Sequence, residues 1–309
     1  MTELAVLPPR SARPAAAPPV RRLLLVGNTR SRKGRRGLAE AQEALRREGY
    51  GFDTLPLSPD QDLTARVRGR RYMVDAVAVA GGDGTLNAIA PALLETGLPL
   101  LVLPTGSAND LARTLRVPPA LPDAVRLART GELRTIDVGF ANGRPFFNVA
   151  NIGLGALVTE NLDSGLKRRL GPLAYPVAAL RTLRRARRFT ARIRGAGWDV
   201  EVQTFQISVG NGRYYGGGTP IEAQAQIDDG QLDLYSLEVS DLLRLLALAP
   251  RLRQGRQRLS AQVRVGACTR FEVETRRRWP VSLDGEILTH TPVTFTISPQ
   301  AVRVFAPAG

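Results

Sequence analysis

Short apolar runs that end at glycines or polar turns alternate with amphipathic stretches from residue 22 to about residue 110. Such runs are typical of buried parallel strands, whereas Leu38, Ala41 and Leu45 recur at the spacing of one helix face. The predicted strands cover residues 22–26, 52–55, 76–80 and 98–103, and the predicted helices cover residues 35–48, 62–71 and 86–95. This alternation predicts a parallel sheet with helices on both faces.

From Thr135 onward the pattern changes to short, often alternating segments separated by Gly or Asn turns, which predicts an antiparallel β-sandwich. The predicted strands are 135–140, 145–151, 190–194, 200–209, 232–239 and 270–274. Two helical insertions interrupt them. The first, 165–188, is rich in Lys and Arg, and the second, 240–257, is rich in Leu and forms either core or the lip of an acyl cleft.

The fold class is therefore predicted to be α/β plus all-β, with a parallel α/β domain at residues 21–134 and a β-sandwich domain with helical insertions at 135–290. Residues 291–309 are predicted to return to the first domain. Residues 1–20 are rich in Pro and Ala and lack a continuous apolar core, so we expect a disordered leader rather than a signal peptide.

Composition narrows the chemistry. A single cysteine excludes an internal disulfide framework, and a single histidine argues against a His-rich zinc site. The net charge of +15 favours a polyanionic partner, either nucleic acid or an acidic membrane surface. The alternative is an arginine-heavy genome that has filled solvated positions with Arg. The basic segments lack interleaved aromatic residues, which argues against nucleic acid.

The most informative stretch is Asp75–Asn87, where a buried strand runs directly into Gly81-Gly82-Asp83-Gly84-Thr85. In a strand, glycine turn and helix start, backbone N–H groups converge on a phosphate, and glycines let the backbone come close. A carboxylate beside phosphates requires a cation or a proton transfer, so Asp83 points to nucleotide chemistry. The loops 28–34, 81–87 and 104–110 all follow predicted strands, and ligands on parallel sheets bind at such ends.

Four motifs occur together: AGGDGTLNAIA, LPTGSANDLARTL, NGRYYGGG followed by AQIDDGQLDL, and VSLDGE. Over about residues 20–307 the chain resembles the diacylglycerol kinase/sphingosine kinase family in its bacterial soluble lipid kinase branch. The GGDGT motif alone is less specific, because NAD kinases share it. The resemblance implies an ATP-binding first domain and a lipid-binding second domain.

The resemblance also assigns roles to the acidic residues. Asp284 would be the general base toward a lipid hydroxyl, Glu286 would share this task or support Mg²⁺, and Asp83 would act through Mg²⁺ or its waters. A carboxylate has an unperturbed pKa near ~4 and is a weak base at neutral pH. The alternative for Asp284 is an ordinary Asp-Gly β-turn.

Two sets of binding residues follow from the same resemblance. The set expected to bind the nucleotide, with Lys33 nearby, is Asn28, Arg30, Ser31, Thr54, Gly81, Gly82, Asp83, Gly84, Thr85, Leu86, Asn87, Gly106, Ser107 and Asn109. A structural Mg²⁺ would be held by Gln226, Asp229 and Gln231, for which the alternative is an ordinary acidic turn.

The chain departs from the family pattern at Thr29, Ala88, Ser107 and Gly155. Gly155 replaces the aspartate that sphingosine kinases use on the lipid headgroup, which argues against a sphingoid base. None of these departures removes the proposed base or the glycine loops.

The sequence thus predicts a lipid kinase that uses ATP and Mg²⁺ to phosphorylate a hydroxyl of a diacylglycerol-like lipid. We expect it in the cytoplasm, peripherally associated with an anionic membrane through the basic segment 165–188, and without a nucleic-acid partner. The alternatives are an NAD kinase, a kinase of a sphingoid base, monoacylglycerol or isoprenoid alcohol, and a catalytically silent lipid-binding module. The oligomeric state stays open, a homodimer included.

Overall fold

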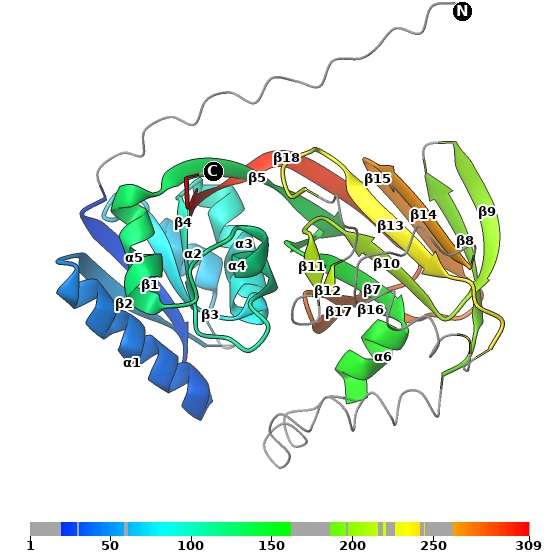
Figure 1. Ribbon diagram of the computed structural model, residues 1–309, viewed down its shortest axis with the longest axis horizontal. Coiled ribbons are helices and arrows are strands. Elements are labelled where there is room, and N and C mark those ends of the chain that lie inside the picture. The colour runs from blue at the N-terminus through cyan, green and yellow to red at the C-terminus, as the bar shows by residue number, and fades with distance from the viewer. Residues whose placement is uncertain are drawn as a thin grey trace, which may run out of the picture.

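The computed structural model describes most of the chain, as the ribbon in Figure 1 shows. The described residues are 20–29, 31–58, 61–161, 186–195, 197–215, 219–220, 226–241, 244 and 262–308. Three predicted features fall mostly or entirely outside the described residues, namely the leader (except Val20) and the insertions 165–188 and 240–257. Arg30 also lies outside them.

A parallel sheet with strand order β2-β1-β3-β4 forms the first domain, which confirms the predicted α/β architecture. Its strands are β1 (Arg22–Asn28), β2 (Gly51–Leu57), β3 (Ala76–Gly81) and β4 (Leu100–Pro104). Its helices are α1 (Arg32–Arg47), α2 (Leu63–Arg68), α3 (Asp83–Thr96), α4 (Asp110–Thr114) and α5 (Leu121–Thr130). Among these helices, α1 packs against α5 and α2 packs against α3.

Two helices begin earlier than their patterns predicted, and in both cases the cap explains the difference. Ser31 caps α1 by accepting a hydrogen bond from the N–H of Gly34, so the helix starts at Arg32 rather than at residue 35. Gly82 is the N-cap of α3, so the last residues of the glycine motif lie in the first turn of this helix.

The second domain is antiparallel, as predicted, and consists of two stacked sheets. The larger sheet continues from β4 through β18, β15, β8 and β9, and the smaller has the order β14-β13-β10-β7-β16-β17. Its elements are β5 (Glu132–Ala141), β6 (Arg144–Phe146), β7 (Val149–Gly153), α6 (Leu154–Asn161), β8 (Phe189–Gly195), β9 (Trp198–Thr204), β10 (Gln206–Gly210), β11 (Tyr214–Tyr215), β12 (Thr219–Pro220), β13 (Leu232–Leu237), β14 (Val263–Cys268), β15 (Arg270–Thr275), β16 (Pro280–Leu283), β17 (Glu286–His290) and β18 (Val293–Ala306).

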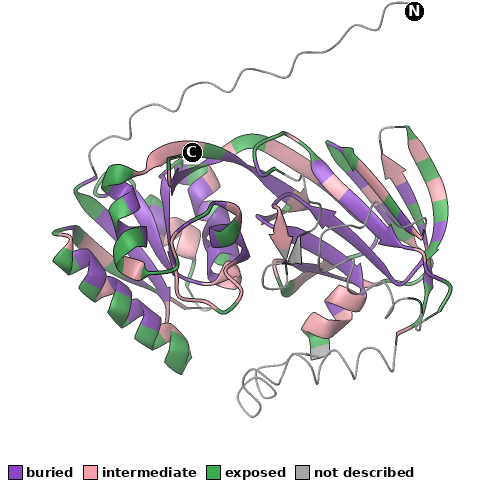
Figure 2. Cartoon of the chain, in the orientation of Figure 1, coloured by how far each residue is buried: buried purple, intermediate pink, exposed green. Residues whose placement is uncertain are grey.

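Side chains from both sheets share one buried cluster, in which Ile193 and Phe271 of the larger sheet meet Ile152 and Val281 of the smaller. Because the inner faces of the two sheets bury each other's apolar residues, the domain is a sandwich. Figure 2 shows buried strands in both halves of the molecule, with exposed residues concentrated on α1 and on the outer strands.

Two strands predicted as continuous are each divided, and these predictions were wrong for a physical reason. The segment 145–151 splits into β6 and β7 because the N–H groups of residues 147–149 donate to the carboxylate of Asp284. The segment 200–209 splits at Phe205 because β9 belongs to the larger sheet and β10 to the smaller.

The long strand β18 runs through both domains (Figure 1). Near its end Val304 pairs in parallel with Leu100 of β4, and near its start Val293–Thr296 pair with β15. Along most of its length, from Phe295 to Ala306, β18 also pairs antiparallel with β5. Among the described helices, none has the length and apolar character that a membrane crossing requires.

Candidate active site

The glycine turn after β3 packs directly against the loop after β4. The N–H groups of Thr105 and Gly106 both donate to the carbonyl of Gly81, each at 3.2 Å. A Cβ added to Gly82 would lie 3.1 Å from the Cα of Gly106, and a Cβ on Gly106 would collide with the backbone of Gly82. The two loops can therefore touch only because both positions are glycine. The prediction that these loops meet at one sheet edge is confirmed.

Lys33 joins the first loop to this pair. Its ammonium group donates to the carbonyl of Gly106 and to the hydroxyl of Ser107, both at 2.9 Å. Asn109 has a left-handed backbone with φ of 53° and donates its side-chain amide to Gly106 as well. Its Oδ1 is buried and has no hydrogen-bond partner. The loop after β4 is therefore held by a cation.

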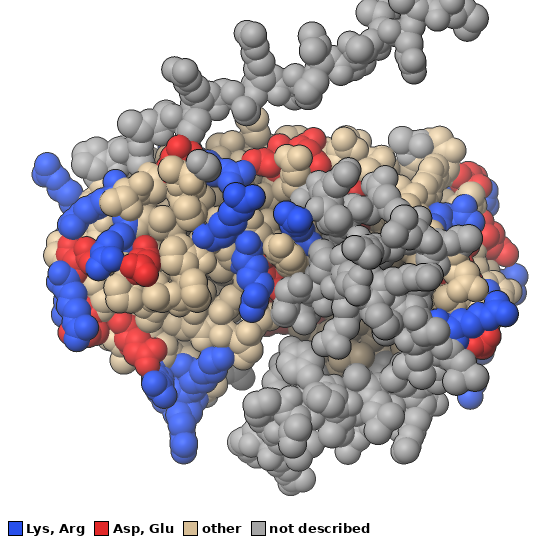
Figure 3. All heavy atoms as spheres, in the orientation of Figure 1, with Lys and Arg blue, Asp and Glu red and all other residues tan. Residues whose placement is uncertain are grey.

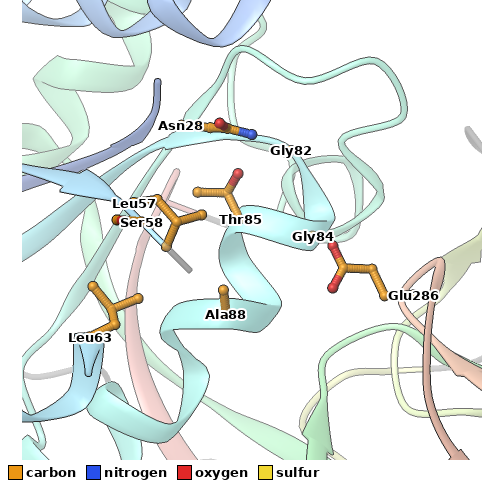
Figure 4. A pocket seen from close by; sticks show the side chains of 9 residues that line it. All are labelled: Asn28, Leu57, Ser58, Leu63, Gly82, Gly84, Thr85, Ala88 and Glu286. Atoms are coloured by element: carbon orange, nitrogen blue, oxygen red, sulfur yellow. The ribbon is translucent and has the colours of Figure 1, made fainter. Parts of the chain in front are cut away.

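A cleft of about 520 Å³ opens at this sheet edge, within the usual size of small-molecule sites (Figure 4). Its lining residues are Asn28, Leu57, Ser58, Leu63, Gly82, Gly84, Thr85, Ala88 and Glu286. Leu57, Ser58 and Leu63 were not predicted, although β2 ends at the same edge as β1 and could have indicated them.

Several predicted nucleotide residues lie elsewhere than in the cleft lining. Thr54 sits in the middle of β2, three residues before Leu57, and its hydroxyl accepts a hydrogen bond from Gln42 of α1. Leu86 is buried in the core of the first domain. The hydroxyl of Ser31 caps α1, and Arg30 lies outside the described residues.

Lys and Arg side chains gather on the surface of the molecule where α1 begins (Figure 3).

Asp284 occupies the two-residue turn between β16 and β17, where Leu283 pairs with Glu286. Asp284 has φ of 47° and Gly285 has φ of 87°, so both residues adopt the left-handed conformation of a tight hairpin turn. Asp284 therefore does lie in an Asp-Gly hairpin turn, which was the alternative to a catalytic role, and this turn does not exclude that role. The turn points the carboxylate back toward the start of β7.

The carboxylate of Asp284 accepts four hydrogen bonds. The N–H of Phe147 (2.7 Å) and the side-chain amide of Asn87 (3.1 Å) donate to Oδ2. The N–H groups of Asn148 (2.8 Å) and Val149 (3.1 Å) donate to Oδ1. Since Asn87 lies on α3 and the other donors lie in the second domain, Asp284 connects the two domains.

Burial raises the pKa of Asp284 to about 6, although the four donors oppose this shift. The ordinary pKa near ~4 does not hold for this carboxylate, because packing around it removes hydration, although the residue keeps partial exposure at the border between the domains. A carboxylate with a pKa near neutrality accepts a proton more readily at physiological pH than an ordinary aspartate does.

Asp83 has a local partner that the sequence did not suggest. Its Oδ2 accepts from the N–H of Asp110 and its Oδ1 from the N–H of Leu111, both at 3.1 Å, so it caps the start of α4. The side-chain amide of Asn148 adds a third hydrogen bond at 3.3 Å. Asp83 therefore ties the two glycine loops together.

The third predicted acid, Glu286, lines the cleft and faces Gly84 (Figure 4). A Cβ on Gly84 would come within 2.7 Å of its Oε1, so this glycine leaves room for the carboxylate. The fold thus gathers Asp83, Asp284 and Glu286 around the border between the domains, from sequence positions about 200 residues apart.

The loop proposed to hold a structural cation keeps Gln226, Asp229 and Gln231 close along the chain. Oδ1 of Asp229 accepts from the N–H of Gln231 at 2.9 Å. Burial raises the pKa of Asp229, and the carboxylates of Asp137 and Asp228 add to this effect. Among the described residues, no three His, Cys, Asp or Glu side chains form a group that could hold a metal ion. The loop offers one carboxylate and carbonyl oxygens, so this site stays a prediction.

Two protein families match the chain, one in each domain. Residues 22–141 match the diacylglycerol kinase catalytic domain, and residues 148–306 match the YegS C-terminal NAD kinase beta sandwich-like domain. The second match covers about half of the chain.

Relatives and solved structures agree with these matches. A "Probable lipid kinase YegS-like" from Pseudomonas aeruginosa (strain UCBPP-PA14) is 36% identical over 251 residues, or 78% of this chain and 82% of the relative. "Lipid kinase YegS" from Escherichia coli (strain K12) is 31% identical over 276 residues, or 87% and 91%. A crystal structure from Bacillus anthracis str. Sterne, provisionally named a diacylglycerol kinase, has a TM-score of 0.77 and 26% identity over 93% of this chain and 95% of that one.

Proposed function

Because the chain belongs to the YegS-like lipid kinases of the diacylglycerol kinase family, we propose that it transfers the γ-phosphate of ATP to a hydroxyl of a diacylglycerol-like lipid. The product would be a phosphatidate-type monoester. ATP would bind the first domain, the lipid would enter the second, and transfer would occur between them.

The observation that carries this proposal is the position of Asp284. A partly accessible carboxylate with a raised pKa lies at the domain border and contacts α3, the helix that begins in the glycine motif. The proposed proton acceptor and the glycine motif that we propose binds phosphate are thereby adjacent, which is the arrangement that phosphoryl transfer requires.

The residues of the cleft fit a bound nucleotide. The start of α3 directs N–H groups toward the sheet edge, and Gly82 has no side chain that could cap them. The packed glycines leave no room for a Cβ, and Lys33 brings a positive charge to the loop after β4. Leu57 and Leu63 give the cleft an apolar wall against which a base can pack.

Mg²⁺, when bound with ATP, neutralises phosphate charge as phosphoryl transfer proceeds. Hard cations prefer carboxylate oxygens, and Glu286 and Asp83 supply them at this border. Asp284 would hold the acceptor hydroxyl and receive its proton as the oxygen bonds to the γ-phosphorus. The bond from the γ-phosphorus to the β–γ bridging oxygen breaks, and ADP leaves with that oxygen. The hydroxyl must take the place of one donor to Asp284, and only the Asn87 amide among the four is not part of the backbone.

The lipid must be reached in a membrane, and basic residues support this part of the proposal. Arg187 and Arg188, at the described end of the predicted basic segment, are exposed. The first turn of α1, where Lys and Arg side chains gather on the surface in Figure 3, contains no acidic residue. Each basic residue near an anionic leaflet contributes about 1 kcal/mol of binding free energy. We propose that the protein associates peripherally with such a surface.

The test is transfer of labelled γ-phosphate from ATP, with Mg²⁺, to lipids in mixed micelles. The panel contains diacylglycerol, monoacylglycerol, sphingosine, ceramide and undecaprenol, with NAD in buffer as the competing acceptor. Label in diacylglycerol supports the proposal. Label in another lipid corrects the substrate, and label only in NAD overturns the proposal in favour of the NAD kinase alternative.

A further inference from the structure

Asn148 contacts both of the carboxylates that lie on opposite sides of the domain border. Its backbone N–H donates to Oδ1 of Asp284 at 2.8 Å, and its side-chain amide donates to Oδ1 of Asp83 at 3.3 Å. Asp83 belongs to the first domain and Asp284 to the second. We propose that Asn148 is a positioning residue, which holds Asp284 in register with Asp83 and so with the phosphate-binding loops.

Asn148 is buried, and its backbone carbonyl is held by two hydrogen bonds. The residue is 2% exposed, in the gap between β6 and β7 where the chain leaves regular strand geometry. Its carbonyl oxygen accepts from the N–H groups of Asn211 (2.9 Å) and Gly212 (3.1 Å). Its Oδ1 faces the position of Gly212, where an added Cβ would lie 3.1 Å away. Within the described part of the chain this Oδ1 has no hydrogen-bond partner, so the contact with Asp83 is what orients the amide, and one buried residue thereby links the two carboxylates.

The chemistry of the site requires an amide of this length. An aspartate at position 148 would place a third carboxylate between two others, and like charges at such separations repel. A glutamine would carry its amide one methylene too far, into a well-packed border. An alanine would keep the N–H bond to Asp284 but lose the bond to Asp83, so it removes only the connection between the two acids.

A purely structural asparagine is available for comparison in the same domain. Asn142 donates its amide to the carbonyl oxygens of His290 (3.4 Å) and Pro292 (3.1 Å) and accepts from the N–H of Thr294 at 3.0 Å. None of these partners lies in the cleft lining. Asn142→Ala therefore measures what the loss of a multiply bonded asparagine does to the fold alone.

This inference rests on the proposed function, since turnover is one of its two readouts. In Asn148→Ala we expect kcat for lipid phosphorylation to fall by about 100-fold, the scale of a misplacement of roughly 1 Å. The KM for ATP should stay within about twofold, because the lost bond orients groups in the transition state and does not bind substrate. Asn148→Asp should lose more than Asn148→Ala. Asn142→Ala should lower Tm and leave kcat unchanged.

The second readout is backbone hydrogen exchange in the free protein, which needs no substrate. Asn148→Ala should speed exchange both at residues 147–149, bonded to Asp284, and at residues 110–111, bonded to Asp83. If Asn148→Ala does not fold, Asn148→Ser is measured in the same way. Unchanged kcat, or exchange that rises in only one of the two segments, overturns the proposal. If the wild-type protein labels no lipid but Asn148→Ala speeds exchange in both segments, the proposed function is contradicted and the role of Asn148 is supported.

Discussion

The side-chain amide of Asn87 donates to Oδ2 of Asp284 at 3.1 Å, although 197 positions separate the two residues in sequence. The same amide donates to the carbonyl of Pro145 at 3.0 Å, so α3 holds the second domain at two points. The helix that begins in the glycine motif is therefore also the element that contacts the proposed base.

Removing this amide should change both stability and the protonation of Asp284. A hydrogen bond to a charged group contributes about 1.5–3 kcal/mol, so Asn87→Ala should lower the free energy of unfolding by this order. The Asn87 bond lowers the pKa of Asp284, so its loss should raise that pKa above about 6. Denaturant unfolding and a pH–rate profile measure the two effects. A profile identical to that of the wild type would mean that Asn87 does not influence the base.

Replacing Asp284 by Asn should abolish lipid phosphorylation while ATP binding stays near the wild-type value, because the side chain lies outside the cleft lining. Turnover and ATP affinity by calorimetry check the two parts. The matched control is Asp199→Asn, which removes an exposed carboxylate paired with Arg192 far from the border. Substantial turnover in Asp284→Asn would assign the base to another group.

The activity should rise with pH through an apparent pKa of about 6, since Asp284 must be ionised to accept a proton. The effect on stability has the opposite sign. The folded protein holds the Asp284 proton more tightly than the unfolded chain, whose ordinary pKa is 3.8. This contribution to stability is therefore complete below pH 3.8 and lost as the pH rises through about 6. Measuring kcat/KM from pH 4.5 to 8, with Asp284→Asn in parallel unfolding experiments, tests both signs.

A Cβ at Gly106 should separate the two glycine loops and weaken the nucleotide site. Overpacking of this kind costs about 1–3 kcal/mol, which corresponds to roughly tenfold or more in the Kd for ATP. Gly51→Ala is the matched control, because a Cβ there meets its nearest atom at an ordinary 3.5 Å. ATP titration of both variants decides the point, and equal affinities would show that the loops tolerate separation.

Replacing Arg184, Arg185, Arg187 and Arg188 by Ala should weaken binding to vesicles that contain anionic lipid. The loss should approach about 1 kcal/mol for each arginine that lies near the surface. The control replaces four arginines that are already paired with acidic side chains, namely Arg192, Arg194, Arg264 and Arg270. Vesicle sedimentation compares the two sets. Equal losses would indicate an effect of net charge alone.

The sequence predicted the parallel sheet and the edge at which its glycine loops lie because both depend on local patterns. The short apolar run Ala76–Ala80 is typical of a buried strand, and the glycines after it permit the close change of direction into α3. The break between β6 and β7 could not be predicted, because the carboxylate that causes it lies more than 130 positions away. The pattern of apolar and polar residues along the chain does not indicate such a distant hydrogen-bond partner.

The site residues, too, could be predicted only where a local motif indicates them. The chemistry of the glycine motif indicated Gly82 and Asp83, whereas the family resemblance indicated Asp284, because an Asp-Gly turn alone is ordinary. Asn148 carries no such signal beyond a polar residue inside the apolar run Phe146–Val149. The raised pKa of Asp284 was missed for a related reason, since it depends on burial by packed neighbours rather than on the motif itself.

The strand β18 has a consequence for the order in which the protein is built. The edge of β4 in the first domain pairs with residues near 304, which leave the ribosome after all of the second domain has been made. Domains commonly fold one after another during synthesis, the N-terminal one first. Here the N-terminal sheet must wait with an open edge until β18 arrives. The two domains thus finish folding together, and an interruption of synthesis before residue 293 would leave both incomplete.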